Sequence, residues 1–472
     1  MNTSLQQAYS SEAFRQMGYQ LINLLADHLQ AREQEHHLPT IKWQEPEQEL
    51  AYWQDDLQKS EKEDPILFFK KILERSVDLH NPKYMGHQIS PPLPISALAG
   101  LVSDFMNNGM GVYEMGMAAT AIEKVVVDFV NQYIGYDTSA SGVLTSGGTL
   151  GNLTALLAAR KAKAHVDVWN DGHQKPLALM VSEQAHYCVD RATKIMGWGE
   201  QGIIKVPVND QYQMQTALLE DYLAKAQKEG VQVIAVVGSA CTTSTGSFDD
   251  LEAIADFCQK HQLWFHVDGA HGGGSIFSKK YKSLVKGIHL ADSVVMDFHK
   301  MLMTPSITTA LLFKDGLQSY ATFSQKAQYL WSQEESPDWY NLAKRTFECT
   351  KLMMSIKAYS IIRTQGAAIF DEFVTQCYDH GKQLALLIKQ RKELELALEP
   401  ACNIVCFRYK ASPGNANSIN ENIRQRILEE GQFYIVKTTL NGETWLRTTL
   451  TNAFTKTKDF KLLLDRIIQL GE

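Results

Sequence analysis

Residues 142–160 read "GVLTSGGTLGNLTALLAAR": a short apolar run, a glycine turn and a helical segment follow one another. The apolar run at 142–145 predicts a buried strand, and the segment from 149 onward predicts a helix. The first backbone N–H groups of a helix have no intrahelical partners, so they favour an anion. The stretch therefore predicts an α/β unit with an anion site at Gly147, Gly148 and Thr149.

Short apolar runs alternate with helical stretches from about residue 90 to residue 320. The runs are ALMVS (178–182), VIAVVGSA (233–240), LWFHVD (263–268), SVVMD (293–297) and TTALLF (308–313). Runs of this length, separated by amphipathic helices, are typical of a mostly parallel sheet flanked by helices. Ligands of such sheets bind beyond the carboxyl ends of the strands, so the polar residues that end these runs are candidate site residues.

The two ends of the chain have other patterns. Residues 11–33 place apolar residues three and four apart, which predicts an amphipathic helix that docks on another domain or subunit. The last hundred residues predict a strand at 403–409, a strand near 445–450 and a helix at 457–470. We expect three parts: a helical segment (1–88), a large domain (89–345) and a small C-terminal α/β domain (346–472).

Composition excludes several classes of protein. The 472 residues, 44% hydrophobic and 21% charged, are typical of a globular protein with a sizeable core. The net charge of −7, without a long basic stripe, indicates small-molecule rather than nucleic-acid partners. No apolar run of about 18 residues or signal-peptide pattern is found, which predicts a cytoplasmic protein without a membrane span. Seven scattered cysteines without CxxC spacing predict reduced thiols, with neither disulfides nor a metal site.

Two strand ends bring a carboxylate and a lysine to one edge of the predicted sheet. Asp268 ends LWFHVD, where a buried carboxylate needs a cation or a strong donor. The segment "SVVMDFHKMLMTPS" (293–306) places Lys300 just after another strand. A lysine amine in a desolvated site can form a Schiff base with an aldehyde. Pyridoxal 5'-phosphate (PLP) matches all three features, because it offers an aldehyde to Lys300, a ring nitrogen to Asp268 and a phosphate to the glycine turn.

The motifs VDGAHGGG (267–274), DFHK (297–300) and TSGGTLGN (145–152) closely resemble those of the group II PLP-dependent amino-acid decarboxylases. This fold-type I family includes glutamate, aromatic amino-acid and diaminobutyrate decarboxylases. The resemblance covers nearly the whole chain, from "NPKYMGHQISPPLP" (81–94) to the final helix. It implies a PLP-binding domain with a mostly parallel seven-stranded sheet, an N-terminal segment that wraps a partner, a small C-terminal domain, and a homodimer with active sites at its interface.

The resemblance also implies roles for single residues around the cofactor ring. Lys300 would hold PLP as a Schiff base, and Asp268 would keep the ring nitrogen protonated. His186, in "SEQAHYCVDRA", would stack on one face of the ring and Ala270 would lie against the other. Thr243, in "SACTTSTGSFDDL", would lie near the cofactor. Without the motif, His186 would also fit a core or capping histidine and Thr243 a turn residue.

Other matching residues concern the phosphate. The resemblance implies that Gly148, Thr149 and His299 contact it. Asp297 departs from the asparagine of several family members, and an acidic group near a phosphate repels it unless it is protonated or turned away. We therefore leave Asp297 outside the cofactor set. Asp249 is expected to cap the helix that follows it.

In the family, a mobile loop from the neighbouring subunit supplies a tyrosine that protonates Cα. The segment "KAQYLWSQEESPDWY" (326–340) lies at that place, and Tyr329 aligns with the tyrosine. Arg447 aligns with an arginine that contacts the substrate carboxylate in the glutamate branch, and a guanidinium matches a carboxylate. His87 and Gln88 are further candidates for lining the substrate pocket. Each of these residues would also fit an ordinary surface or structural role.

The substrate is open at this stage. Acidic residues in 326–340 fit a cationic substrate, and our hypothesis is a basic or acidic aliphatic amino acid such as 2,4-diaminobutyrate, ornithine, lysine, aspartate or glutamate. Segment 344–366 departs from the family's usual Gly-Arg-Arg run. The alternatives are an aromatic-amino-acid decarboxylase, an aminotransferase or carbon–carbon lyase of fold-type I, and a catalytically silent binding subunit. A dinucleotide oxidoreductase is disfavoured because TSGGTLGN lacks G-x-G-x-x-G spacing.

Overall fold

The computed structural model describes residues 3–34, 37–59, 63–323, 338–412 and 414–472. Contacts within the chain divide it into two compact units. Unit 1 consists of Met1–His87, Leu386–Ala397 and Cys406–Glu472, and unit 2 of Gln88–Ala385 and Leu398–Val405.

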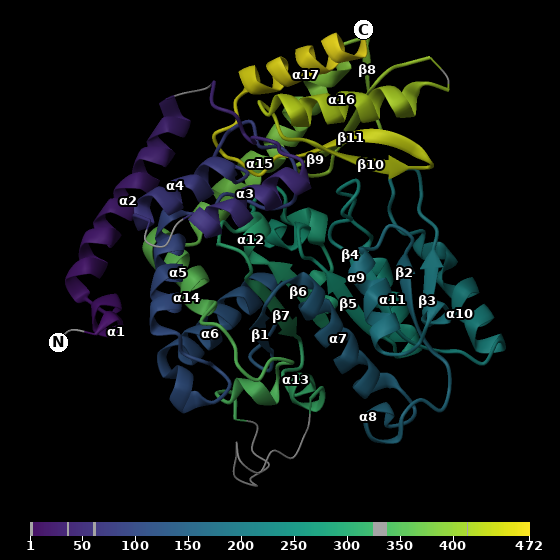
Figure 1. Cartoon of the computed structure of the whole chain (residues 1–472). Helices are drawn as coiled ribbons and strands as arrows, with labels where there is room; N and C mark the ends of the chain where they lie inside the picture. The colour runs from purple at the N-terminus through teal and green to yellow at the C-terminus, as the bar shows by residue number, and fades with distance from the viewer. Residues whose placement is uncertain (1–2, 35–36, 60–62, 324–337, 413) are drawn as a thin grey trace. The chain divides into compact units, whose positions relative to one another are not determined.

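Unit 2 contains a seven-stranded sheet of order β1-β7-β6-β5-β4-β2-β3 (Figure 1). The strands are β1 (Ser141–Thr145), β2 (Leu177–Ser182), β3 (Ile203–Val206), β4 (Gln232–Ser239), β5 (Trp264–Asp268), β6 (Ser293–Asp297) and β7 (Thr309–Phe313). Only β7 runs antiparallel to its neighbours, β1 and β6. The predicted mostly parallel sheet is therefore confirmed. Strand β3 escaped prediction because it is an edge strand whose first three residues are not buried, so it does not form an apolar run.

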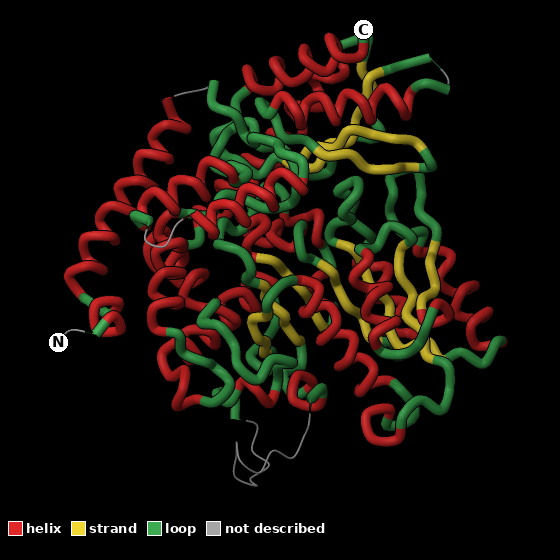
Figure 2. The backbone as a smooth tube through the Cα atoms, in the orientation of Figure 1, coloured by secondary structure: helices red, strands yellow, loops and turns green. Residues whose placement is uncertain are grey.

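Helices surround this sheet (Figure 2). Those of unit 2 are α5 (Pro94–Met106), α6 (Tyr113–Ile134), α7 (Gly148–Lys163), α8 (Val168–Asp171), α9 (Tyr187–Ile195), α10 (Leu219–Lys228), α11 (Leu251–His261), α12 (Phe298–Met301), α13 (Gln318–Ala321), α14 (Ser355–Gln365) and most of α15 (Ala368–Lys389). Helices α7 and α11 cover opposite faces: His266 of β5 bonds to Asn152 of α7, whereas a Cβ at Gly238 of β4 would touch Leu251 of α11 and Phe265. Strands covered on both faces read as continuous apolar runs, as the sequence shows.

The acidic pair before α11 corrects one expectation. Asp250, and not Asp249, caps the helix, since its side chain accepts the N–H of Ala253 at 3.1 Å. Asp249 is buried and accepts the N–H groups of Met214 at 2.7 Å and Ser239 at 2.8 Å. Burial raises the pKa of the Asp249 carboxyl to about 6. The residue therefore stabilises the end of β4, a tertiary role that a turn pattern does not reveal.

Two buried cations attach the chain after residue 338 to the strand that leads into the glycine turn. Arg345 donates from Nη2 to Ser141 Oγ at 2.7 Å and to the carbonyl of Gly142 at 3.1 Å. Lys351 forms a buried ion pair with Glu123 of α6, whose carboxylate also accepts the N–H of Leu144 in β1 at 2.9 Å. Strand β1 is therefore fixed by the very segment that departs from the family pattern.

Unit 1 contains a four-stranded sheet of order β10-β11-β9-β8. Its strands are β8 (Leu394–Leu396), most of β9 (Ile404–Tyr409), β10 (Val436–Leu440) and β11 (Glu443–Thr449), and its helices are α1 (Ser4–Ala8), α2 (Ser11–Gln34), α3 (Pro46–Lys59), α4 (Pro65–Arg75), α16 (Ala416–Glu430) and α17 (Thr457–Gly471). The predicted N-terminal helix, the strands at 403–409 and 445–450 and the final helix are confirmed. No helix among the described residues has the length and apolarity needed to cross a membrane.

The two compact units group residues by their contacts, so the three predicted domains (1–88, 89–345 and 346–472) stay a prediction. Residues 346–385 belong to unit 2, in which α14 packs on α5 and α6. Residues 1–87 form one unit with the C-terminal strands, since Met85 receives a hydrogen bond from Thr449 N–H at 3.0 Å and donates one to the carbonyl of Tyr434 at 2.9 Å. A sequence pattern shows that a helix is amphipathic but not which surface it covers.

Candidate active site

A cavity of about 310 Å³ opens in unit 2 at the carboxyl ends of the parallel strands. All residues predicted to bind the cofactor line it: Gly147, Gly148, Thr149, His186, Thr243, Asp268, Ala270, His299 and Lys300. They come from the start of α7, the start of α9, the loop after β4, the end of β5 and the start of α12. The fold therefore brings together residues that the sequence separates by more than a hundred positions.

Lys300 follows β6 directly, in α12. Its Nζ lies 3.0 Å from Asp297 Oδ2, and the Asp297 side chain is only 2% exposed. Burial alone lowers the pKa of the Lys300 amine, but Asp297 and Asp268 outweigh it and raise that pKa. Burial likewise raises the pKa of the Asp297 carboxyl, but Lys300 and His299 bring it below its ordinary value. The pair is therefore ionised, and the carboxylate that contacts the lysine is Asp297 rather than Asp268.

Asp268 ends β5, the strand next to β6 in the sheet. It lies opposite Val295 in the parallel register, two residues before the end of β6. Its side chain accepts the N–H of Ala270 at 3.2 Å, and the residue is 8% exposed. A second carboxylate therefore faces the cavity, close enough to influence the Lys300 amine.

His186 caps helix α9 and lines the cavity at the same time. Its Nδ1 accepts the backbone N–H of Cys188 at 3.3 Å. Burial lowers the pKa of its imidazole, which is therefore neutral at neutral pH. Because Nδ1 is an acceptor, the neutral ring carries its hydrogen on Nε2. The two interpretations of this histidine, cap and cavity residue, are compatible.

The start of α7 suits a phosphate. Gly147 is its N-cap, with φ of 108° and ψ of 156°, and no side chain caps the first N–H groups. A Cβ at Gly148 would come within 3.1 Å of Asp297 Oδ2 and 3.5 Å of the Ala270 Cβ, so a side chain there would narrow the cavity. An uncapped helix N-terminus fits an anion, the Lys300 amine fits an aldehyde, and the Asp268 carboxylate fits a protonated ring nitrogen. The residues present therefore fit PLP.

His299 lies between the glycine turn and the N-terminal part of unit 2. Its Nδ1 lies 3.2 Å from the carbonyl oxygen and 3.3 Å from the nitrogen of Thr308, and burial lowers the pKa of its ring. The carbonyl of His299 accepts the N–H of Ser90 at 3.2 Å, which brings the segment containing Gln88 to this end of β6. Gln88 Nε2 is buried and makes no hydrogen bond with any described residue.

The other predicted substrate residues are distributed differently. Arg447 is buried in β11 of unit 1, and His87, the last residue of the N-terminal part of that unit, is exposed. Although His87 is exposed as a residue, part of its ring is withdrawn from water, and this desolvation and then the charge of Arg447 lower its pKa, so these two residues lie near each other. Tyr329 lies outside the described residues. The described part of segment 326–340 begins at Asp338, which forms an ion pair with Lys344 at 2.7 Å.

Sequence reasoning missed a buried hydrogen-bond chain that begins in the cavity wall. Asn152 donates to Cys188 Sγ at 3.4 Å, and its Oδ1 lies 2.7 Å from His266 Nε2. The other ring nitrogen of His266 lies 2.8 Å from Ser293 Oγ. Burial lowers the pKa of His266 to about 4, so its ring is neutral and donates to Asn152. One signal was available: His266 precedes Asp268 by two residues and therefore shares its face of β5.

Other residues in the cavity wall also escaped prediction. They are Ser146, Cys241, His271, Asp297 and Ile307. His271 is buried and its Nε2 lies 2.8 Å from Asn403 Oδ1. It stands inside the DGAHGGG motif, but its partner is more than a hundred residues away, so the sequence does not reveal the contact. The seven cysteines all lie among the described residues and form no disulfide with one another.

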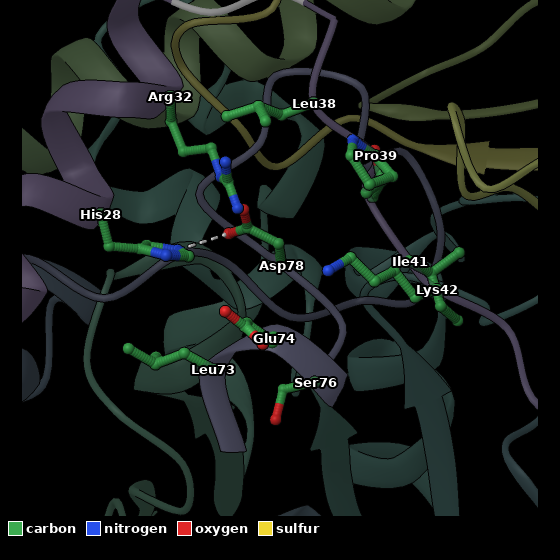
Figure 3. Close-up of a pocket in the computed structure, with 11 residues that line it drawn as sticks. His28, Arg32, Leu38, Pro39, Ile41, Lys42, Leu73, Glu74, Ser76 and Asp78 are labelled. Carbon is green, nitrogen blue, oxygen red and sulfur yellow. Dashed lines mark hydrogen bonds and ion pairs between the residues drawn. The ribbon is translucent and has the colours of Figure 1, made fainter. Parts of the chain in front are cut away.

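Unit 1 contains a smaller cavity of about 210 Å³ (Figure 3). His28 and Arg32 of α2 point toward Asp78 there, with His28 Nε2 3.4 Å from Asp78 Oδ1 and Arg32 in an ion pair with the same carboxylate. Burial raises the pKa of Asp78, but the hydrogen bond with His28 and the charge of Arg32 bring it below its ordinary value. None of the predicted site residues lines this cavity, so its charged group serves to attach α2 to the segment after α4. In the described part of the chain, no group of three or more potential ligands suits a metal ion.

Comparison with known proteins gives the class of enzyme. The model of the pyridoxal-dependent decarboxylase conserved domain matches residues 46–410. An aromatic-L-amino-acid decarboxylase from Bacillus atrophaeus is 26% identical over 476 residues, 98% of this chain and 96% of that protein. An L-2,4-diaminobutyrate decarboxylase from Acinetobacter baumannii is 30% identical over 423 residues, 85% of this chain and 82% of that protein. An L-aspartate decarboxylase from Metarhizium robertsii is 30% identical over 359 residues, 75% and 72% of the two chains.

Solved structures show the same fold. Mouse CSAD in apo form superposes with a TM-score of 0.90 at 24% identity, over 98% of this chain and 100% of that one. Oryza sativa TDC with PLP and tryptamine superposes with a TM-score of 0.89 at 20% identity, over 98% of both chains. The chain therefore belongs to the pyridoxal-dependent decarboxylase family, and it is an enzyme that uses PLP to decarboxylate an amino acid. The predicted family, fold and cofactor are confirmed.

Proposed function

We propose that the enzyme converts an aliphatic L-amino acid with a charged side chain to the corresponding amine and CO2. The observation that carries the chemistry is a partly buried amine and a carboxylate, Lys300 and Asp268, near the ends of adjacent strands in one cavity with an uncapped helix N-terminus. Relatives named for 2,4-diaminobutyrate and aspartate support the aliphatic class. A relative named for aromatic amino acids makes an aromatic substrate the second candidate.

Each residue near the ring has a distinct proposed task. When bound, PLP supplies an aldehyde for an amine and a pyridinium ring that accepts the electron pair left at Cα when CO2 departs. Lys300 would bind the aldehyde carbon, and the Asp268 carboxylate would keep the ring nitrogen protonated. The neutral ring of His186, held by Cys188 N–H, would pack on one face and Ala270 on the other.

The remaining proposed contacts concern the phosphate and the substrate. Backbone N–H groups at Gly147, Gly148 and Thr149 would bind the phosphate, with His299 and Thr243 beside it. Gln88 is a proposed substrate contact because its buried Nε2 has no partner among the described residues. His87 and Arg447 are proposed on the family resemblance, and Arg447 would bind a carboxylate. Tyr329 is proposed, on the same ground, as the proton donor to Cα.

We further propose a cytoplasmic homodimer with active sites at the subunit interface. The support is an exposed apolar face on α5, formed by Leu98, Leu101, Val102 and Phe105, which are 44–67% exposed. These residues are spaced three and four apart and so share one side of the helix. A contiguous apolar face of this kind marks a protein interface. Helix α2, which has no buried residue, would wrap the partner.

The test is a CO2-release assay with PLP across a panel of L-amino acids: 2,4-diaminobutyrate, ornithine, lysine, aspartate, glutamate, tyrosine and tryptophan. We expect turnover of one charged aliphatic amino acid, and a loss of about a thousandfold or more in Lys300→Ala, together with loss of the visible absorbance of bound PLP. Lys225→Ala, which changes an exposed lysine of α10, is the matched control and should retain activity.

The panel separates the alternatives. Turnover of tyrosine or tryptophan alone would replace the aliphatic proposal with the aromatic one. Bound PLP without CO2 from any amino acid would contradict decarboxylation, and keto acids or phosphorylated amines would then test the aminotransferase and lyase alternatives.

A further inference from the structure

The cavity contains an ionised pair that the roles above do not use. Asp297 Oδ2 lies 3.0 Å from Lys300 Nζ, across the first turn after β6. The other oxygen, Oδ1, accepts the hydroxyl of Thr309, which lies directly opposite Asp297 in the antiparallel register of β7. The carboxylate is therefore held by the sheet with one oxygen directed at the lysine.

We propose that Asp297 is a positioning residue that binds the ammonium form of Lys300 whenever this lysine is not attached to the cofactor. The proposal rests on the PLP-dependent reaction above for its part in turnover. The ion pair itself is a property of the protein without cofactor and can be tested there.

The groups around Lys300 favour this assignment. The titratable groups that influence it or that it influences are Asp268 at the end of β5, Asp297 at the end of β6, His299 in α12, His186 and Cys188 at the start of α9, and Cys241 after β4. Burial raises the pKa of both thiols and keeps them protonated, so Cys188 and Cys241 add no negative charge beside the amine. Among the described residues, Asp297 is the carboxylate that forms an ion pair with the amine, and it makes a larger contribution than Asp268 to keeping the amine protonated.

The pair sets a condition for cofactor capture. An ammonium group is not a nucleophile, so Lys300 must first lose one proton to solvent and leave Asp297. The free amine would then be able to attack the aldehyde that PLP supplies, and the aldehyde oxygen would leave as water with the two remaining amine hydrogens. Whenever the lysine is released again as an amine, a proton from solvent would restore the ammonium that Asp297 binds.

The same geometry explains how an acidic residue lies beside the glycine turn. A Cβ at Gly148 would come within 3.1 Å of Asp297 Oδ2, so the carboxylate borders the phosphate site. In the protein without cofactor, the Lys300 ammonium balances the charge of this carboxylate at 3.0 Å, and His299 Nε2 lies 3.8 Å from the same oxygen.

Trace acetylation of the protein without cofactor tests the pair, because acetic anhydride reacts only with unprotonated amines. The Lys300 peptide is quantified by mass spectrometry from pH 7 to 11, with the exposed Lys225 in the same digest as reference. In Asp297→Asn the half-reaction pH of Lys300 should fall by at least one pH unit, so that labelling at pH 8 rises about tenfold. The half-reaction pH of Lys225 should stay unchanged.

Two further variants keep the test decisive. Asp268→Asn should shift the Lys300 profile less than Asp297→Asn does. Thr309→Val keeps both charges but removes the donor to Asp297 Oδ1, so it should cause a smaller shift of the Lys300 profile in the same direction. If Asp297→Asn does not fold, Thr309→Val takes its place in the test. The proposal is overturned if Asp297→Asn and Thr309→Val both leave the profile unchanged, or if Asp268→Asn shifts it more.

Cofactor capture gives the second readout. At pH 7 the visible band of bound PLP should appear faster in Asp297→Asn than in the unmodified protein. The expected gain in rate is about tenfold for each pH unit by which the half-reaction pH of Lys300 acetylation falls. A shifted acetylation profile with an unchanged capture rate would overturn the role in capture. If the protein releases no CO2 while both readouts are as expected, the proposed reaction is contradicted and the ion pair is supported.

Discussion

Arg345 is the largest side chain that the fold buries almost completely, with 1% of it exposed. Its Nε donates to Ser319 Oγ at 2.9 Å, and its Nη2 donates to Ser141 and Gly142 of β1. Burial lowers the pKa of its guanidinium, but an arginine remains charged. These bonds attach the chain after residue 338 to the strand that precedes the glycine turn, so Arg345 supports the cofactor site without touching it.

Replacing Arg345 with alanine should therefore destabilise the protein by about 3 kcal/mol or more, because it leaves buried acceptors without donors and opens a cavity. Arg345→Lys should recover only part of this loss, since an ammonium cannot reach the same acceptors in a planar fork. The free energy of unfolding is measured by urea denaturation. Arg363→Ala, on an exposed position of α14, is the control and should stay within about 0.5 kcal/mol of the original protein. An equal loss in both variants would contradict the buried role of Arg345.

Helix α7 is the element that links the sheet to the cofactor site. It packs along β4, β5, β6 and β7, and its first turn forms one wall of the cavity. The close packing is visible at Gly151, where a Cβ would come within 3.1 Å of Val295. The helix therefore holds its uncapped N-terminus in a fixed place relative to the ends of β5 and β6.

The conformation of Gly147 makes the helix start a test of this arrangement. Its φ of 108° with ψ of 156° is a region that residues other than glycine essentially do not adopt. Gly147→Ala should cost about 1–3 kcal/mol of stability and weaken PLP binding at least tenfold, because the strain moves the N–H groups of the turn. Equilibrium titration of PLP absorbance and thermal unfolding measure the two effects.

Gly18→Ala is the matched control for the helix start. Gly18 lies inside α2, and a Cβ there meets nothing within 4 Å. Alanine is the better helix former, so this change should leave PLP binding intact and add up to about 1 kcal/mol of stability. Unchanged PLP affinity in Gly147→Ala would show that the turn does not bind the phosphate.

At the scale of the whole molecule, exposed apolar surface is the main unexplained feature of one chain. Besides the face of α5, Met115 and Met117 at the start of α6 are more than half exposed. Burying such residues is favourable by about 25 cal/mol per Å² of apolar area, which a second copy of the chain would provide.

Phe105→Asp should therefore convert the proposed dimer to a monomer, since it would bury a carboxylate in the interface. Phe105 is 67% exposed in the single chain, so the folded monomer should tolerate the change. Sedimentation velocity at micromolar concentration gives the mass: two chains for the original protein and one for the variant. Leu462→Asp, at a 53% exposed position of α17, should keep the mass of the original protein. A monomeric original protein would rule out the dimer at that concentration.

The sequence by itself determined the class of fold and predicted a set of residues that line one cavity. The sequence reveals five strands as continuous apolar runs: β2, β4, β5, β6 and β7. They can be recognised because they are buried on both faces, where every position favours an apolar residue. The glycine turn, Asp268 and Lys300 can be recognised in the sequence because each lies at the end of a strand or within three residues of it, so their order along the chain also fixes their place at the edge of the sheet.

Tertiary structure decided which of these residues are partners. The sequence analysis left Asp297 outside the cofactor set because a carboxylate repels a phosphate. In the fold, however, Asp297 pairs with Lys300 and accepts a hydrogen bond from Thr309 of the neighbouring strand. The same is true of Arg345 and of residues 1–87, whose contacts join segments far apart in the chain. Such contacts depend on how strands and helices pack, and a pattern of neighbouring residues in the sequence does not identify a partner far away in the chain.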